Sequence, residues 1–108
     1  SRKIISVFQP HRFSRVRLLK KEFAKAFKLC DEVVLCPVYP AGEKINKYFD
    51  YHSFGKLIVK KSNVTVAILK SENDLLNYFK KNLFDNELVV CMGAGSISSW
   101  IKSISKKL

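Results

Sequence analysis

Apolar residues along the chain form four short continuous runs, and each run is followed by a segment with helical spacing. The runs cover residues 3–8, 32–36, 64–69 and 88–92, and runs of this length and composition are typical of buried strands. Amphipathic helices are predicted over residues 14–29, 53–61, 72–83 and 96–106. This regular alternation of strand and helix predicts an α/β fold, with a mostly parallel sheet that is covered by helices on both faces.

Turn-forming and capping residues mark the ends of these elements. Ser14 has a side chain that can cap the first helix, and Pro37 ends the second strand. Gly93 and Gly95 follow the fourth strand, whereas Gly55 falls inside the second predicted helix and weakens that assignment. The chain contains no internal repeat and no linker-like segment. We therefore expect residues 1–108 to form a single domain.

Polar residues that can carry chemistry cluster where the predicted strands end. They fall in residues 9–15 after the first strand, 37–44 after the second and 93–96 after the fourth. In open α/β sheets, ligands bind at the carboxyl ends of the strands. We therefore expect these loops to meet at one edge of the sheet and to form a binding site there.

The first of these loops is rich in cationic side chains. Pro10 stiffens the exit from the strand, His11 and Arg12 follow it, and Arg15 and Arg17 lie in the first turn of the helix. Cations at a helix N-terminus oppose the helix dipole, so their presence there makes sense if an anion lies between them and the free backbone N–H groups. Arginine also grips carboxylate and phosphate groups in a bidentate manner. The loop therefore predicts an anion-binding site, unless the arginines are simply solvated.

The other two loops carry weaker signals. Tyr39 and Glu43 belong to a loop with two prolines, and Glu43 could pair with an arginine of the first loop or bind a substrate amine. The third loop resembles a truncated dinucleotide fingerprint, because Gly93 and Gly95 are present but Ser98 replaces the third glycine. An NAD site is therefore not expected. Close packing of helix on strand, with backbone N–H groups available to an anion, is the better interpretation.

The net charge of +11 suggests a nucleic-acid or membrane-surface partner when it is taken alone. Most of the basic residues are lysines scattered along the chain, which favours a solvated lysine-rich surface. The arginines are concentrated near the start of the chain, at positions Arg2, Arg12, Arg15 and Arg17. Their clustering indicates a geometric role instead of general solubility.

The cysteines show no spacing typical of a disulfide framework or a metal site. Cys36 and Cys91 lie in strand-like apolar runs, and Cys30 follows the first helix. We expect free, buried thiols in a reducing cytoplasm. No apolar run is long enough to cross a bilayer, so we expect no membrane partner.

The three loops together resemble the carboxy-terminal domain of the Mur ligases, in the branch that adds L-alanine. The resemblance rests on residues 7–17 (Val-Phe-Gln-Pro-His-Arg-Phe-Ser-Arg-Val-Arg), 38–43 (Val-Tyr-Pro-Ala-Gly-Glu) and 93–97 (Gly-Ala-Gly-Ser-Ile), in the same order along nearly the whole chain. It implies a Rossmann-like domain of a three-domain cytoplasmic ligase of peptidoglycan synthesis.

The resemblance also implies an activity. ATP, with Mg²⁺ on its phosphates, activates the carboxylate of UDP-N-acetylmuramate as an acyl phosphate, and the amine of L-alanine attacks it. Arg12 and Arg15 match catalytic positions, and the substrate-binding positions are His11, Arg12, Arg15, Tyr39 and Glu43. A central domain of the same protein is expected to bind most of the ATP and Mg²⁺, and no metal ligand is expected in this chain. No nucleic-acid partner is expected.

The chain departs from the family pattern in ways that limit this interpretation. The phosphate loop, the UDP-sugar domain and an Asp-Tyr-x-His-His-Pro-like segment are absent, and Pro37 stands where many relatives carry an acidic residue. We therefore expect a piece of a longer enzyme that is inactive alone. Alternatives are another Mur-type amino-acid ligase, a ligase that recycles murein tripeptide, and a basic nucleic-acid-binding module.

Overall fold

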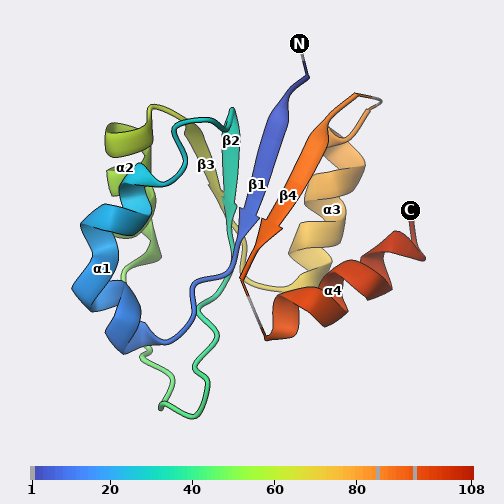
Figure 1. Ribbon diagram of the computed structural model, residues 1–108. Helices are drawn as coiled ribbons and strands as arrows, with labels where there is room; N and C mark the ends of the chain where they lie inside the picture. The colour runs from blue at the N-terminus through green and yellow to red at the C-terminus, as the bar shows by residue number, and fades with distance from the viewer. Residues whose placement is uncertain (1, 85, 94) are drawn as a thin grey trace.

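In the residues that the computed structural model describes, 2–84, 86–93 and 95–108, the chain forms a sheet of four parallel strands in the order β3-β2-β1-β4 (Figure 1). The strands are β1 (Ile4–Phe8), β2 (Glu32–Leu35), β3 (Thr65–Ile68) and β4 (Leu88–Met92). The predicted strands and the parallel sheet are confirmed, and the strand ends differ by one residue at most.

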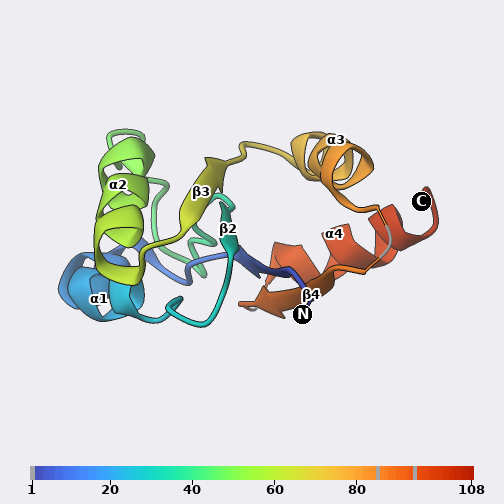
Figure 2. The same cartoon turned by 90° about the horizontal axis from the view of Figure 1, so that it is seen from above.

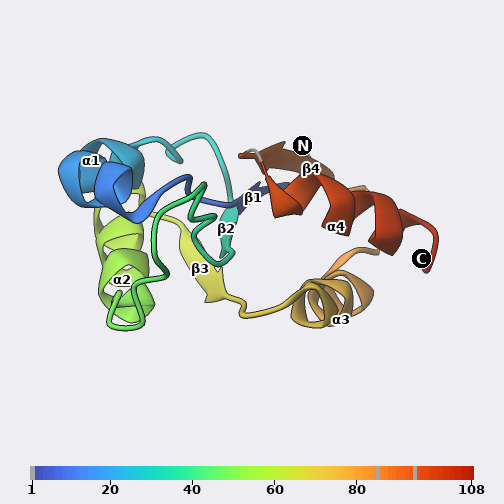
Figure 3. The ribbon, with the colours of Figure 1, turned by 90° about the horizontal axis from the view of Figure 1, so that it is seen from below.

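Helices cover both faces of this sheet, as Figures 2 and 3 show. One face packs against α1 (Phe13–Lys25) and α2 (Tyr51–Ser62), and the other against α3 (Glu72–Asn82) and α4 (Ser96–Ser105). Among the described residues, no helix is long and apolar enough to cross a membrane. The Rossmann-like α/β class predicted from the sequence is therefore confirmed.

Alternate residues of the two central strands point into two separate cores. Phe8 of β1 and Leu35 of β2 pack with α1 and α2, whereas Val7 and Val34 pack with α3 and α4. All four side chains are buried. Because both faces of these strands are covered, their sequence reads as a continuous apolar run instead of an alternating one.

The order of the strands reverses beside β1. From β1 the chain adds β2 and then β3 on one side, and it later returns to place β4 on the other side of β1. In open α/β sheets a crevice forms at this point, outside the carboxyl ends of the strands. The loops that follow β1 and β4 therefore flank the expected binding crevice.

The first helix differs most from its prediction. It begins at Phe13, so Ser14 is not its cap, and the N-cap residue Arg12 makes no side-chain capping hydrogen bond. It also ends at Lys25, earlier than the periodicity suggested. The Ser14 hydroxyl instead donates to the carboxylate of Glu43. The prediction was wrong because the Glu43 carboxylate, which is distant in sequence, accepts the hydrogen bonds of Ser14 at the start of the helix.

The second helix is longer at its start than the sequence suggested. Asp50 caps it, since its carboxylate accepts a hydrogen bond from the Ser53 N–H at 2.9 Å, and the helix begins at Tyr51. Gly55 does not break the helix. A Cβ atom at Gly55 would lie 3.2 Å from Cδ1 of Ile68, so the glycine allows α2 to pack closely on β3.

The cysteines are free, as predicted, but they are not all buried. Burial raises the pKa of the Cys36 thiol to about 12, with a smaller contribution from Cys91. Cys30 is half-buried and Cys91 is exposed. The prediction for Cys91 was wrong because β4 is the outermost strand on its side of the described sheet, so neighbouring elements cover it less than they cover β1 and β2.

Candidate functional site

Gln9, at the end of β1, fills the crevice at the strand-order reversal. Its side chain is buried (2% exposed), and its amide nitrogen donates to the Ser96 hydroxyl at 2.8 Å and to the Pro37 carbonyl at 3.1 Å. Its amide oxygen accepts a hydrogen bond from the Ile97 N–H at 2.9 Å. One side chain therefore connects the loops that follow β1, β2 and β4.

The position of Gln9 changes the interpretation of the third loop. Ile97 lies in the first turn of α4, where the sequence suggested backbone N–H groups available to an anion. The Ile97 N–H is instead satisfied by Gln9. The Gly93-Ala94-Gly95 turn that was compared with a dinucleotide fingerprint includes Ala94, which lies outside the described residues.

The two glycines of that turn permit close packing. A Cβ atom at Gly93 would lie 2.5 Å from the backbone oxygen of Gln9, and one at Gly95 would lie 2.5 Å from Cγ of Tyr39. Both glycines also have positive φ angles, +136° and +97°. Close approach of backbone to neighbouring groups is a use to which glycine is suited, because it has no Cβ. The turn therefore packs closely, as predicted, but its neighbours at these two glycines are the loop residues Gln9 and Tyr39 and not a helix on a strand.

The first and second loops continue the pairing of β1 with β2 beyond the strands. The Tyr39 N–H donates to the Pro10 carbonyl at 2.8 Å, and the Arg12 N–H donates to the Tyr39 carbonyl at 2.7 Å. The rings of His11 and Tyr39 are stacked, with centroids 5.7 Å apart and an interplanar angle of 29°. These contacts confirm that the loops meet at one edge and hold His11 and Arg12 beside Tyr39.

Arg12 has an uncommon backbone conformation. Its φ angle is +68° and its ψ angle is 129°, a backbone conformation that residues other than glycine rarely adopt. The Arg12 N–H bonds to Tyr39, and the Arg12 carbonyl accepts from the Val16 N–H at 3.2 Å. Strained conformations of this kind persist only where the surroundings hold them, and they concentrate at functional sites. The strained backbone therefore marks Arg12 as a candidate functional residue whose orientation is fixed by its surroundings.

Glu43 places a carboxylate at the N-terminus of α1. It accepts hydrogen bonds from the backbone N–H of Ser14 at 3.3 Å and from the Ser14 hydroxyl, and its Oε2 lies 3.5 Å from Nη2 of Arg12. These contacts lower the pKa of the Glu43 carboxyl, with the Ser14 hydroxyl as the largest cause and Arg12 as a smaller one. Pairing with an arginine of the first loop is confirmed. The anion at this helix end is the protein's own carboxylate.

The remaining arginines of the first loop separate in space. Arg15 is exposed in the first turns of α1, and among the described residues it has no ion pair. Arg17 lines a hollow between α1 and α2, together with lysines. The sequence placed both in one anion site, but one helical turn does not bring side chains two residues apart to the same face. Arg12 is tied to the strand-end edge by its contacts with Tyr39 and Glu43, and Arg17 also lines a second hollow together with Ser14 and Glu43. The assignment of Arg15 to the same site stays a prediction.

Sequence reasoning missed the parts that hold this edge together. Gln9 was given no role of its own from the sequence, although a polar residue directly after an apolar strand is a signal for such a role. Tyr51 was given no role from the sequence either. Its hydroxyl oxygen accepts a hydrogen bond from the Val38 N–H at 3.0 Å, and burial raises its pKa. This contact fixes the start of the second loop.

Comparison with known proteins identifies relatives over the whole chain. The UDP-N-acetylmuramate–L-alanine ligase of Pelagibacter ubique is 46% identical over 101 residues, which are 94% of this chain. Proteins of the same name from Rhodospirillum rubrum and a Bradyrhizobium species are both 35% identical, over 99% and 100% of this chain. The resemblance to the Mur ligases is confirmed. No family model matches the chain.

The match covers only part of each Mur ligase. The chain spans about a fifth of the length of these relatives, 22% of the first two and 23% of the third. A layered α/β structure that matches a fifth of a longer ligase is consistent with a part of one domain, or one domain, of such an enzyme. The strand-end edge, with His11, Arg12, Arg15, Tyr39 and Glu43, is the candidate functional site of this Mur ligase domain.

Proposed function

We propose that this chain is the carboxy-terminal domain of an ADP-forming ligase that joins L-alanine to UDP-N-acetylmuramate. The names of the relatives support the reaction and the substrates. The observation that supports a role for this domain is the cationic edge, where the backbone of Arg12 is held against Tyr39 and its side chain is paired with Glu43. We propose that this edge completes the site for the amino acid and the acyl phosphate.

The guanidinium groups are proposed to act on negative charge. Arg15 is exposed and free of ion pairs among the described residues, so it can bind the carboxylate of L-alanine without first losing a partner. Arg12 and His11 lie on the same loop and face the reacting group in this proposal. When the amine attacks an acyl phosphate, negative charge gathers on the acyl and phosphoryl oxygens, and positioned cations stabilise it.

Tyr39 and Glu43 are proposed to form the wall behind these cations. The Tyr39 ring stacks on His11, and the Glu43 carboxylate holds the Arg12 side chain and the start of α1. Because its pKa is lowered, Glu43 carries its negative charge at neutral pH. That charge can also attract the ammonium group of an incoming amino acid.

The residues of this edge do not fit ATP or Mg²⁺ by themselves. The Ile97 N–H of α4 already donates to the Gln9 amide oxygen, and the Ser14 N–H of α1 already donates to the Glu43 carboxylate. These donors are therefore not available to phosphate groups. Among the described residues, no group of three His, Cys, Asp or Glu side chains could hold a metal ion. We therefore propose that other parts of the longer enzyme hold the nucleotide and its metal ion.

The test uses the full-length protein and measures release of ADP that depends on L-alanine. Replacement of Arg12 or Arg15 by alanine is expected to lower kcat by about a hundredfold or more, the scale seen when a positioned transition-state donor is lost. Lys25→Ala is the matched control, because Lys25 is an exposed cation on the same helix but lies in its last turn, at the end opposite to the site. Near-normal rates for both Arg12→Ala and Arg15→Ala would remove their assignment.

The choice of amino acid needs a separate measurement. A panel of amino acids and a murein tripeptide, assayed with the unmodified full-length enzyme, distinguishes L-alanine ligation from the sister reactions. We expect kcat/KM to be highest for L-alanine. A higher value for another substrate would keep the ligase class and overturn the proposed substrate.

A further inference from the structure

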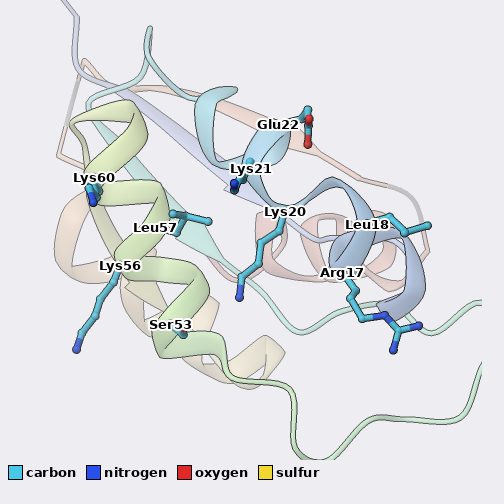
Figure 4. A pocket seen from close by; sticks show the side chains of 9 residues that line it. All are labelled: Arg17, Leu18, Lys20, Lys21, Glu22, Ser53, Lys56, Leu57 and Lys60. Atoms are coloured by element: carbon cyan, nitrogen blue, oxygen red, sulfur yellow. The ribbon is translucent and has the colours of Figure 1, made fainter.

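A strongly cationic groove lies between α1 and α2, on the side of these helices that faces away from the sheet (Figure 4). Its volume is about 610 Å³, and side chains from both helices line it. Its charged residues are Arg17, Lys20, Lys21 and Glu22 from α1, and Lys56 and Lys60 from α2. The groove therefore concentrates positive charge across two helices that are far apart in sequence.

Glu22 is the one acidic side chain that lines this groove in the described part of the chain, so the groove keeps an excess of positive charge. Among the described residues, none of the five groove cations takes part in an ion pair, whereas Lys3, Arg12 and Lys107 elsewhere in the chain do. Cations that face each other across a groove repel one another and disfavour the packed state. An anionic partner would relieve this repulsion.

The groove also exposes apolar surface beside a break in the helix. Leu18 is 79% exposed and lines the groove, and Leu57 lies on its opposite wall. Leu19 has non-helical angles of φ −112° and ψ 22°, although α1 contains neither proline nor glycine. A leucine exposed beside five cations favours a ligand that carries both acidic and apolar groups.

A second hollow continues the groove, and its acidic residues help to distinguish between classes of anionic ligand. It measures about 540 Å³, and Arg17 and Lys20 line both hollows. It also contains the carboxylates of Glu43 and Asp50, and the side chain of Tyr48, a residue that is 94% exposed. A phosphodiester backbone would meet these carboxylates unfavourably. A polypeptide can instead alternate acidic, neutral and apolar side chains along the two hollows.

We propose that the α1/α2 groove is a docking surface for an acidic segment of another protein, which also carries apolar residues. The carboxylates of that segment pair with the lysines of both helices, and an apolar side chain packs against Leu18. The groove opens away from the sheet and none of the five strand-end site residues lines it, although Glu43 lines the second hollow that continues it. The proposal therefore does not depend on the ligase function.

The test uses the full-length protein and a short fluorescein-labelled peptide of alternating glutamate and leucine, with binding measured by fluorescence anisotropy. The groove variant is the double charge reversal Lys20→Glu with Lys56→Glu. The matched control is Lys102→Glu with Lys106→Glu, which makes the same change of charge at exposed positions at the end of α4. Circular dichroism verifies that both variants remain folded.

We expect the groove variant to weaken binding of this peptide by about tenfold or more, because two exposed ion pairs become repulsive, while the control changes it by about twofold at most. A glutamine–leucine peptide should bind much more weakly than the acidic one. Equal losses in the two variants would overturn the proposal, as would tighter groove-dependent binding of a single-stranded oligonucleotide. Binding to the isolated chain but not to the full-length protein would show that the rest of the enzyme covers the groove, and would also overturn it.

Discussion

Replacement of Gln9 by methionine tests whether this one side chain holds the strand-end loops together. Methionine has a similar length but cannot make the hydrogen bonds to Pro37, Ser96 and Ile97 that the Gln9 amide makes among the described residues. At about 1 kcal/mol for each hydrogen bond, the free energy of unfolding should fall by about 3 kcal/mol. The buried Ile97 N–H would also be left without its partner, and an unsatisfied buried donor adds to the loss.

Urea unfolding of the same chain, followed by circular dichroism, measures this loss. With a typical slope for a small domain, a loss of 3 kcal/mol lowers the urea midpoint by about 2 M. It lowers the melting temperature by about 15 °C. Asn73→Met is the matched control, because it replaces an exposed amide on α3. A midpoint shift for Gln9→Met no larger than that of the control would refute the assigned role.

Two further predictions concern the same edge. Gly95→Ala should lower the free energy of unfolding by about 2 kcal/mol more than Gly42→Ala does. Both glycines have positive φ angles (+97° and +92°), but the new Cβ would meet the Tyr39 ring only at Gly95, whereas Gly42 faces open space. Equal losses in urea unfolding would contradict the close contact. The pKa of Glu43 is lowered in the folded state, mainly by Ser14, so its contribution to stability should be present above its ordinary value of 4.5 and be lost as the pH falls through the folded-state pKa. Glu43→Gln should therefore lose less stability than the unmodified chain between about pH 6 and about pH 3, and an equal loss in both proteins would count against this role.

The layered fold could be predicted from the sequence because hydrophobic periodicity is a local signal. The run at residues 3–8 becomes β1, and the run at 88–92 becomes β4 without any change. The strand order could not be read in this way. Whether β4 lies beside β1 or beside β3 depends on which faces pack together. No residue pattern within a strand indicates which strand pairs with it.

The site was predictable in its residues but not in its connections. Arg12, Tyr39 and Glu43 were identified from their positions after predicted strands, and the structure brings them together. The capping of α1 by Glu43 could not be foreseen, because the carboxylate comes from a loop that is distant in sequence while Ser14 is a good cap by local rules. Local rules also could not show that Gln9 occupies the crevice.

The carboxylate of Glu43 at the start of α1 also makes anion binding at this edge a competition. A substrate carboxylate that approaches Arg12 and the Ser14 N–H meets a site that already holds an anion of the same kind. Such a carboxylate would have to displace Glu43 from these donors, and because Glu43 is tethered nearby, it competes at a high effective concentration and weakens the apparent affinity. An external anion therefore binds here only if it also gains contacts that Glu43 cannot make.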